Sequence, residues 1–154
     1  MELIERIKAE IQAFDEKRKQ LSGELQKEFP KLLQPLLEKS KVIESIGWTQ
    51  YTPYFNDGDS CEFQVHNSDL DINGVDYYDL EDEFDIFEEE IWSSSTRRTV
   101  PNPNYNPEEA EILNQIKEIL HSIPKDFYED LFGDHVQVTV YRDGRVEVED
   151  YDHD

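Results

Sequence analysis

The first forty-one residues place apolar side chains at alternating steps of three and four. This spacing puts them on one side of a helix. Pro30 should end or kink that helix, and leucines predict a second helix from about Lys31 to Lys39. We expect the apolar side of the first helix to pack on the chain's own sheet, because it spans fewer than four heptads and includes an arginine; a dimer through this helix is the alternative. The series consists of Ile4, Ile7, Ile11, Phe14, Arg18, Leu21 and Leu25.

Aromatic and β-favouring residues then predict a β hairpin from Gly47 to His66. Asn56 to Asp59 supply its turn, and Pro53 indicates an edge strand or a bulge. Residues 68–78 follow as "SDLDINGVDYY". A two-residue Asn-Gly loop there predicts a second short hairpin or strand extension, with Ile72 opposite Val75 and Leu70 opposite Tyr77.

The stretch from Asp79 to Ile91 combines dense acidity with a narrow apolar series. Leu80, Phe84, Phe87 and Ile91 recur at steps of four, three and four, which predicts a helix with one buried side. The remaining positions are almost all carboxylates, and the repulsion between them is tolerable if the apolar side is buried. A loop is expected after this helix, up to Asn106.

The last third of the chain has the clearest signals. Asn106 as cap, Pro107 and Glu109 mark a helix start, and apolar positions from Ile112 to Ile123 give its buried side. A short helix should run from about Pro124 to Phe132, with Gly133 ending it.

Alternating valines follow and predict a C-terminal β hairpin. A three-residue loop, Arg142 to Gly144, pairs Val140 with Val146 and keeps the valines on one face, whereas a two-residue loop would mix the faces. Gly144 should then be left-handed. The final residues, 151–154, are expected to fray.

These elements predict an α+β fold in a single domain, residues 1–154. It would contain an N-terminal helical hairpin, an antiparallel sheet of four or more strands, an acidic helical insertion, and two helices before a C-terminal β hairpin. The expected segments are 1–41 (helical), 42–96 (acidic hairpins and helix), 97–106 (loop) and 107–154 (helices and hairpin).

Charge is distributed unevenly along this chain of 154 residues. The net charge is −22, and residues 42–96 contribute −15 of it with no Lys or Arg. An aromatic content of 12% argues for a folded protein with a charged surface. Such a charge opposes direct binding to nucleic acid or to an anionic membrane and favours a basic protein partner. Without a long apolar run or a signal-peptide pattern, a cytoplasmic location is expected.

Candidate chemistry is sparse. Asp69 to Gly74, "DLDING", matches the first half of a calcium loop, but Leu80 stands where the bidentate Glu belongs, so a β hairpin is the better interpretation. The four histidines have no metal spacing, and Cys61, the single cysteine, excludes an internal disulfide. No phosphate loop, nucleophile elbow or dinucleotide motif is present, so nothing supports an enzyme.

Residues 48–63, "WTQYTPYFNDGDSCEF", resemble the signature W-T-Q-Y-T-P-Y-F-N-D-G-D-x-C-x-F of small acidic proteins from bacteria and their phages. The C-terminal stretch from Phe132 is similar to the end of the same family. The resemblance covers about forty residues and implies a shared fold and a bacterial or phage intracellular setting. It implies no catalytic residues, because the family has no established activity.

The leading hypothesis is therefore a non-enzymatic binding protein that presents an acidic face to a basic protein surface. Its sharper form is a nucleic-acid mimic, such as a phage inhibitor of a host DNA-binding or defence protein. The alternatives are a calcium or divalent-metal-binding protein, a small hydrolase marked by a cleft with a strongly shifted carboxylate or histidine, and an acidic housekeeping domain. No cofactor is expected, and the protein would be a monomer or a dimer through the N-terminal helix. The predicted partner-binding residues are Asp69, Asp71, Asp76, Asp79, Glu81, Asp82, Glu83, Asp85, Glu88, Glu89 and Glu90.

Overall fold

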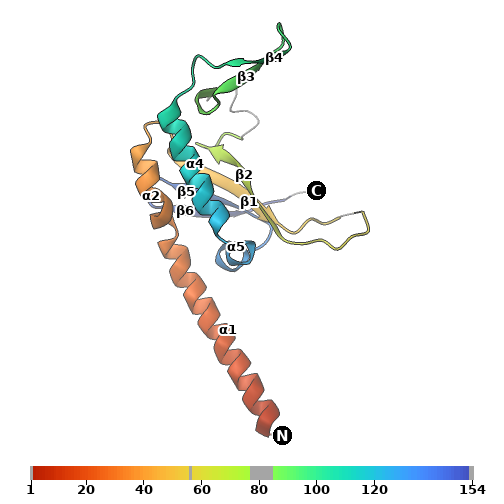
Figure 1. The fold of residues 1–154 in the computed structure, drawn as a ribbon. Coiled ribbons are helices and arrows are strands. Elements are labelled where there is room, and N and C mark those ends of the chain that lie inside the picture. Colours follow the sequence, from red (N-terminus) through yellow and green to blue (C-terminus); the bar gives the residue numbers. More distant parts are fainter. Residues whose placement is uncertain (1, 56, 77–84, 153–154) are drawn as a thin grey trace.

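A computed structural model describes residues 2–55, 57–76 and 85–152 (Figure 1). The fold class is α+β, as predicted. A long N-terminal helix leads into an antiparallel four-stranded sheet, and two helices precede a C-terminal hairpin. The elements are α1 (Glu2–Glu28), α2 (Pro30–Lys39), β1 (Ser45–Tyr51), β2 (Gln64–Ile72), η2 (Asp85–Phe87), β3 (Glu90–Ser93), β4 (Arg98–Pro101), α4 (Pro107–Ser122), α5 (Lys125–Phe132), β5 (Val136–Tyr141) and β6 (Val146–Asp150).

The main sheet has the strand order β2-β1-β5-β6, and every neighbouring pair is antiparallel. The C-terminal hairpin has the predicted register, with Val140 opposite Val146 and Val138 opposite Val148. Gly144 has a φ of 90°, so its three-residue loop uses the left-handed conformation that glycine adopts without strain. Matching the apolar faces was therefore sufficient to select the loop length.

The pairing of β1 with β2 confirms the first predicted hairpin, and the chain turns at Asp57 and Gly58, whose φ angles are 46° and 88°; the paired strands, however, stop well short of this turn. β1 ends at Tyr51 and β2 begins at Gln64, so residues 52–55 and 57–63 belong to an arm that projects from the sheet (Figure 1). Thr52 anchors the base of this arm, because its backbone N–H and its hydroxyl both donate to Asp134 at 2.7 Å. Pro53 follows immediately, and its missing N–H is consistent with a strand that stops there.

β2 continues past Asp69 as the predicted strand extension. Ile72 and Val75 exchange both backbone hydrogen bonds around Asn73-Gly74, whose φ angles are 55° and 80°. The expected pairing of Leu70 with Tyr77 lies outside the described residues. Between Gly47 and Thr49 the β1–β2 register shifts, so β2 has extra residues opposite Trp48.

The core lies between one face of the sheet and the helices α2, α4 and α5, which cover that face in Figure 1. Ile46, Trp48, Val138 and Val140 project into it from the central strands and are fully buried. Trp48 meets Tyr128 of α5 edge-on, with ring centroids 5.8 Å apart. The predicted helix start is confirmed, since the Asn106 side chain accepts from the backbone N–H of Glu109.

Two buried polar side chains connect elements across this core. Gln50 is fully buried and its amide donates to the carbonyl oxygens of Tyr128 and Gly133 at 2.9 and 2.8 Å, while its own oxygen accepts from the Trp48 indole. Glu109 is also buried, and accepts from the Ser40 hydroxyl and a backbone N–H after α2. Each side chain thus ties a helix to a distant segment.

The predicted packing of the N-terminal helix is wrong. α1 has no buried residue, so its apolar side does not pack on the chain's own sheet. α2 continues from α1 after a bend at Phe29 and Pro30 instead of folding back along it (Figure 1). Heptad spacing identified the apolar side correctly, but spacing does not specify what covers it.

The acidic stretch also differs from its predicted structure. Residues 77–84, where most of the predicted acidic helix falls, lie outside the described residues. Asp85 to Phe87 form one 3-10 turn, and Glu90 then begins β3, which pairs antiparallel with β4. The expected helix is therefore wrong for its last part, and β4 occupies part of the segment expected as a loop. Asn102 closes this small sheet, because its backbone N–H donates to Glu89 and its amide to Glu88.

Candidate functional site

The face of the four-stranded sheet opposite the helices is the candidate site. We call it the open face. Cross-strand partners share a face, so the pairs Thr49–His66, Gly47–Asp71 and Thr49–Gln137 all belong to it. Glu149 pairs with Gln137 and Glu147 with Thr139, which adds two carboxylates from β6.

A hollow of about 440 Å³ lies on this face. Asp69 and Asp71 reach it from β2, and Asp76 from the segment after the Asn73-Gly74 turn. Gly47 lies opposite Asp71 in the register, and a Cβ at Gly47 would be 3.5 Å from that of Asp71, so the strands approach closely here. The other residues that line the hollow are Trp48, Thr49, Val65, His66, Ser68, Gln137 and Tyr151.

Aromatic rings line one side of the hollow. Tyr51 and His66 have ring centroids 4.5 Å apart, and Tyr151 stacks on Tyr51 at 5.7 Å. The backbone N–H of Tyr151 donates to His135, so this residue is held in place and the expected fraying is wrong for it. Aromatic faces beside carboxylates suit a cationic group, which both attract.

Asp71 is the electrostatic centre of the hollow. Its burial disfavours the charged form, the nearby Asp76 carboxylate adds repulsion, and together these raise the pKa of Asp71 to about 6. A hydrogen bond of 3.2 Å from the Gln137 amide lowers this pKa, but by less than burial and Asp76 raise it. The fold therefore keeps a carboxylate where its charge is unfavourable.

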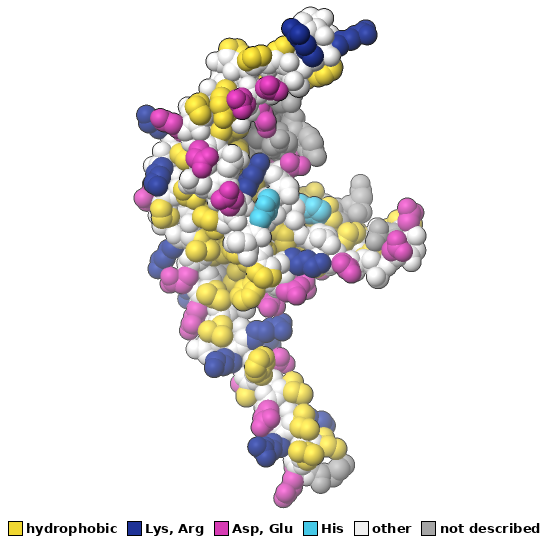
Figure 2. All heavy atoms as spheres, viewed as in Figure 1, with side chains coloured by type: hydrophobic (Ala, Val, Ile, Leu, Met, Phe, Trp, Pro, Cys, Tyr) yellow, Lys and Arg dark blue, Asp and Glu magenta, His cyan; other side chains and the backbone are white. Residues whose placement is uncertain are grey.

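Positive charge is scarce on the strands around it. β1, β2, β5 and β6 contain no Lys or Arg. On the helix side of the molecule, by contrast, positive and negative side chains are interspersed (Figure 2). The two sides of the sheet thus present very different fields to a partner.

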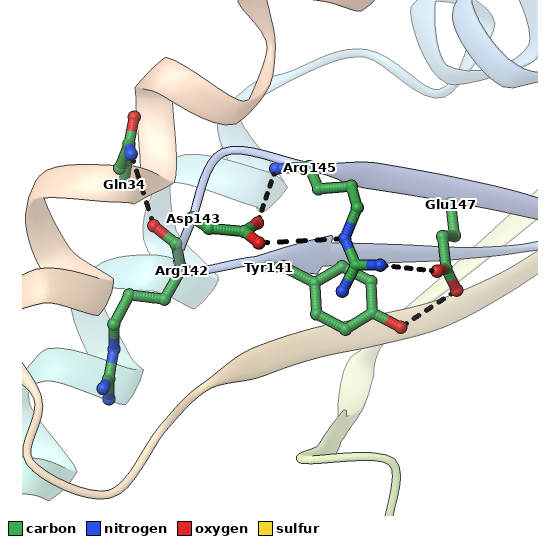
Figure 3. A network of polar contacts seen from close by, with 6 residues as sticks. All are labelled: Gln34, Tyr141, Arg142, Asp143, Arg145 and Glu147. Carbon is green, nitrogen blue, oxygen red and sulfur yellow. Dashed lines mark hydrogen bonds and ion pairs between the residues drawn. The ribbon is translucent and has the colours of Figure 1, made fainter.

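Arg145 borders the open face but is paired with acidic groups (Figure 3). Its guanidinium lies 3.4 Å from Glu147 and 3.8 Å from Asp143, and stacks over the Tyr141 ring at 4.1 Å. The Tyr141 hydroxyl donates to Glu147, and this hydrogen bond raises the pKa of Tyr141. Arg145 therefore offsets the negative charge at the turn between β5 and β6 and leaves that of the hollow unchanged.

The predicted site residues divide into three groups. Asp69, Asp71 and Asp76 come together in the hollow. Asp85 lies in η2, and Glu88, Glu89 and Glu90 precede or begin β3, in the small sheet that extends beyond the main one (Figure 1). Asp79, Glu81, Asp82 and Glu83 lie outside the described residues.

Sequence reasoning missed several residues of the open face. Glu147 and Glu149 were detectable, because pairing Val140 with Val146 places them beside Gln137 on the other face. Thr49 and Tyr151 had no such signal, since their place in the hollow depends on the shifted β1–β2 register and on the path of the chain after β6.

The calcium-loop candidate takes a strand geometry. Asp69 to Ile72 belong to β2, and the Asn73 amide is engaged with backbone groups of Val42, Glu44 and Ser45. Within residues 2–55, 57–76 and 85–152, no group of three or more His, Cys, Asp or Glu side chains is arranged to hold a metal ion. The β-hairpin interpretation of this segment is confirmed.

The comparisons with known proteins give no match: no family model, curated protein or solved structure corresponds to this chain. Among the described helices, none is long and apolar enough to cross a membrane.

Proposed function

We propose that this protein is a non-enzymatic binding protein that presents its open face to a basic protein surface. One observation supports this most directly: four strands without a single Lys or Arg display carboxylates around a hollow. A rigid sheet fixes these charges in space, so a partner gains their attraction without ordering them first.

The sharper form of the proposal is a nucleic-acid mimic. Carboxylates at alternate positions of a strand, such as Glu147 and Glu149, recur about every 7 Å. A basic groove that neutralises such a row would release counterions much as it does on DNA, so binding should weaken steeply with salt. The resemblance of residues 48–63 to small acidic bacterial and phage proteins implies a bacterial or phage setting, and in that setting the basic partner would be a host DNA-binding or defence protein.

The test compares two variants of equal charge. The open-face variant carries Asp69→Asn, Asp71→Asn and Asp76→Asn. The control removes three exposed carboxylates from the helices on the other side of the sheet. Its substitutions are Glu111→Gln, Glu118→Gln and Glu129→Gln.

Wild-type protein is immobilised, and bacterial lysate is passed over it at low and high salt. A retained protein is then purified and its affinity measured by calorimetry for wild type and both variants, with duplex DNA as competitor. We expect a basic partner that is lost at high salt, is displaced by DNA, binds the control variant and fails to bind the open-face variant.

Other results discriminate between the hypotheses. Equal affinity for both variants would refute the open face as the binding surface. A partner that DNA does not displace would refute the mimic while leaving an acidic binding protein. The absence of any salt-sensitive basic partner would favour an acidic housekeeping domain whose open face is only a solvated surface.

One observation favours a second candidate function. A half-buried carboxylate with a pKa near neutrality inside a hollow is a feature of acid–base catalysis, and Asp71 has this property, with His66 on the same hollow. A small hydrolase would require a substrate to fit the hollow. Hydrolysis of a panel of ester, phosphoester and glycoside substrates that is lost in Asp71→Asn would support this class, and full activity in that variant would exclude Asp71 as the acid or base.

A further inference from the structure

The apolar side of α1 is exposed along the whole helix. Ile4, Ile11 and Phe14 expose 47%, 56% and 74% of their surface. Single exposed apolar residues are common, but a continuous line of them marks a contact surface. Hydrophobic side chains along α1 are visible in Figure 2. The other exposed members of the line are Ile7, Leu21 and Leu25.

The rest of the fold supports only the second half of this helix. Arg18 pairs with Asp130 of α5 at 3.1 Å, and Ser22 and Gln26 border the same recess beside α5. The first half extends away from the sheet and its helices (Figure 1). An isolated helix of such a length is marginal in water, so a partner for the exposed side would stabilise it.

We propose that α1 pairs with α1 of a second copy of this chain as an antiparallel coiled coil. The apolar series occupies the a and d positions of consecutive heptads, with Ile4, Ile11, Arg18 and Leu25 at a. In an antiparallel pair, a residues face d residues of the partner helix. One register then places Ile4 opposite Leu21, Ile7 opposite Arg18 and Ile11 opposite Phe14.

The charge along α1 supports the antiparallel direction. Residues 2–16 contain five acidic and two basic side chains, whereas residues 17–28 contain four basic and two acidic ones. Two helices running in opposite directions therefore place an acidic half against a basic half. A parallel pair would place like charges together.

The residues flanking the apolar side select this register. Lys8 and Asp15 are e positions, Glu10 and Lys17 are g positions, and e faces e and g faces g in an antiparallel pair. The register above sets Lys8 against Asp15 and Glu10 against Lys17, each twice by symmetry. A parallel pair would instead set Glu10 against Asp15 of its partner, which is repulsive.

Arg18 is compatible with the pair. Its guanidinium already lies at Asp130, and its side chain remains exposed, so the aliphatic stem is available to Ile7 of the second copy while the charge stays in water. This pairing is independent of the function proposed for the open face.

The first test is the molar mass of the full chain by sedimentation equilibrium over a range of concentrations. We expect a reversible dimer for wild type and a monomer for the double variant Ile11→Ser, Phe14→Ser. Both substitutions are at exposed positions, so the near-UV circular dichroism of the buried Trp48 should be unchanged. A monomeric wild type at every concentration, or a dimer that survives the double variant, would overturn the proposal.

The second test exchanges charges without touching the apolar side. Variant one carries Lys8→Glu and Glu10→Lys, variant two carries Asp15→Lys and Lys17→Glu, and neither changes the net charge. For each variant alone, the dissociation constant of the dimer should be at least about tenfold higher than for wild type, because every flanking pair becomes repulsive.

Mixing the two variants restores all four pairs only in an antiparallel heterodimer. We therefore expect the mixture to dimerise about as well as wild type. A mixture as weak as either variant alone would refute the antiparallel register, and wild-type affinity in each variant alone would show that these charges do not face one another.

Discussion

Replacing Asp71 with asparagine should stabilise the protein at neutral pH and leave its stability nearly unchanged in acid. Asn has the same shape as Asp and keeps an oxygen that accepts the Gln137 amide. It removes the charge that burial and Asp76 make unfavourable. The substitution therefore isolates the electrostatic penalty of the hollow from its packing.

The direction and size of the effect follow from the shifted pKa. Because folding raises the pKa of Asp71 from 3.8 to about 6, the folded state binds this proton more tightly than the unfolded state. Ionisation therefore costs nothing below the lower value, an increasing amount between the two, and a constant amount above the higher value. A shift of this size corresponds to at most about 3 kcal/mol. Asp71 is only half-buried, and screening by water reduces our expectation to about 1–2 kcal/mol.

The assay is urea unfolding of wild type and Asp71→Asn, followed by tryptophan fluorescence, at about pH 4, at the lower end of the transition, and at about pH 7.5, above it. The control is Glu118→Gln, which removes one exposed negative charge from α4 and should change stability by only a few tenths of a kcal/mol at either pH. A difference between wild type and Asp71→Asn that is equal at both pH values, or a variant less stable than wild type near neutrality, would refute the electrostatic account of the hollow.

The buried polar side chains give two further predictions. Gln50→Leu leaves two carbonyl oxygens and the Trp48 indole without their partner, so it should lower the free energy of unfolding by about 2–4 kcal/mol in urea titrations; a loss below 1 kcal/mol would contradict this bonding scheme. Glu109→Ala removes the acceptor of the Ser40 hydroxyl and should cost about 2–3 kcal/mol, whereas Glu109→Gln, which retains one acceptor and the same shape, should cost less; equal losses would assign the effect to the carboxylate charge, which both variants remove, and would refute a contribution from the retained acceptor.

The sequence predicted those elements whose signals are local. The Asn106 cap, the end of α5 at Gly133 and the register of β5 with β6 each depend on neighbouring residues, and each is confirmed. Face matching by the valines was decisive for the hairpin, since a shift of one residue would have exposed them.

Other elements depend on partners distant in sequence, and there the prediction failed. Phe87 and Ile91 fit a helical period, yet Ile91 pairs with Val100 across a turn that no periodicity revealed. A short acidic segment has weak local preference, so tertiary pairing determined its structure.

The candidate site was partly predictable for the same reason. Asp69 and Asp71 alternate along one strand, which places them on one face from sequence alone. Their meeting with Gln137 and Tyr151 requires the order β2-β1-β5-β6 and the irregular pairing of β1 with β2, neither of which is encoded in any single segment.

The outermost strands of the main sheet have a consequence for self-association. Within the part of the chain that the structure describes, β6 pairs with a strand on one side only, and so does β2 apart from the bridge between its last residue, Ile72, and Val75. An unpaired strand edge is a template on which other chains polymerise. Glu147, Glu149 and Asp150 give β6 a negative edge, and Asp69 and Asp71 do the same for β2. The same carboxylates that would attract a basic partner thus repel an approaching copy of the sheet. Acidification below about pH 4 would neutralise most of them and remove this protection against fibre formation.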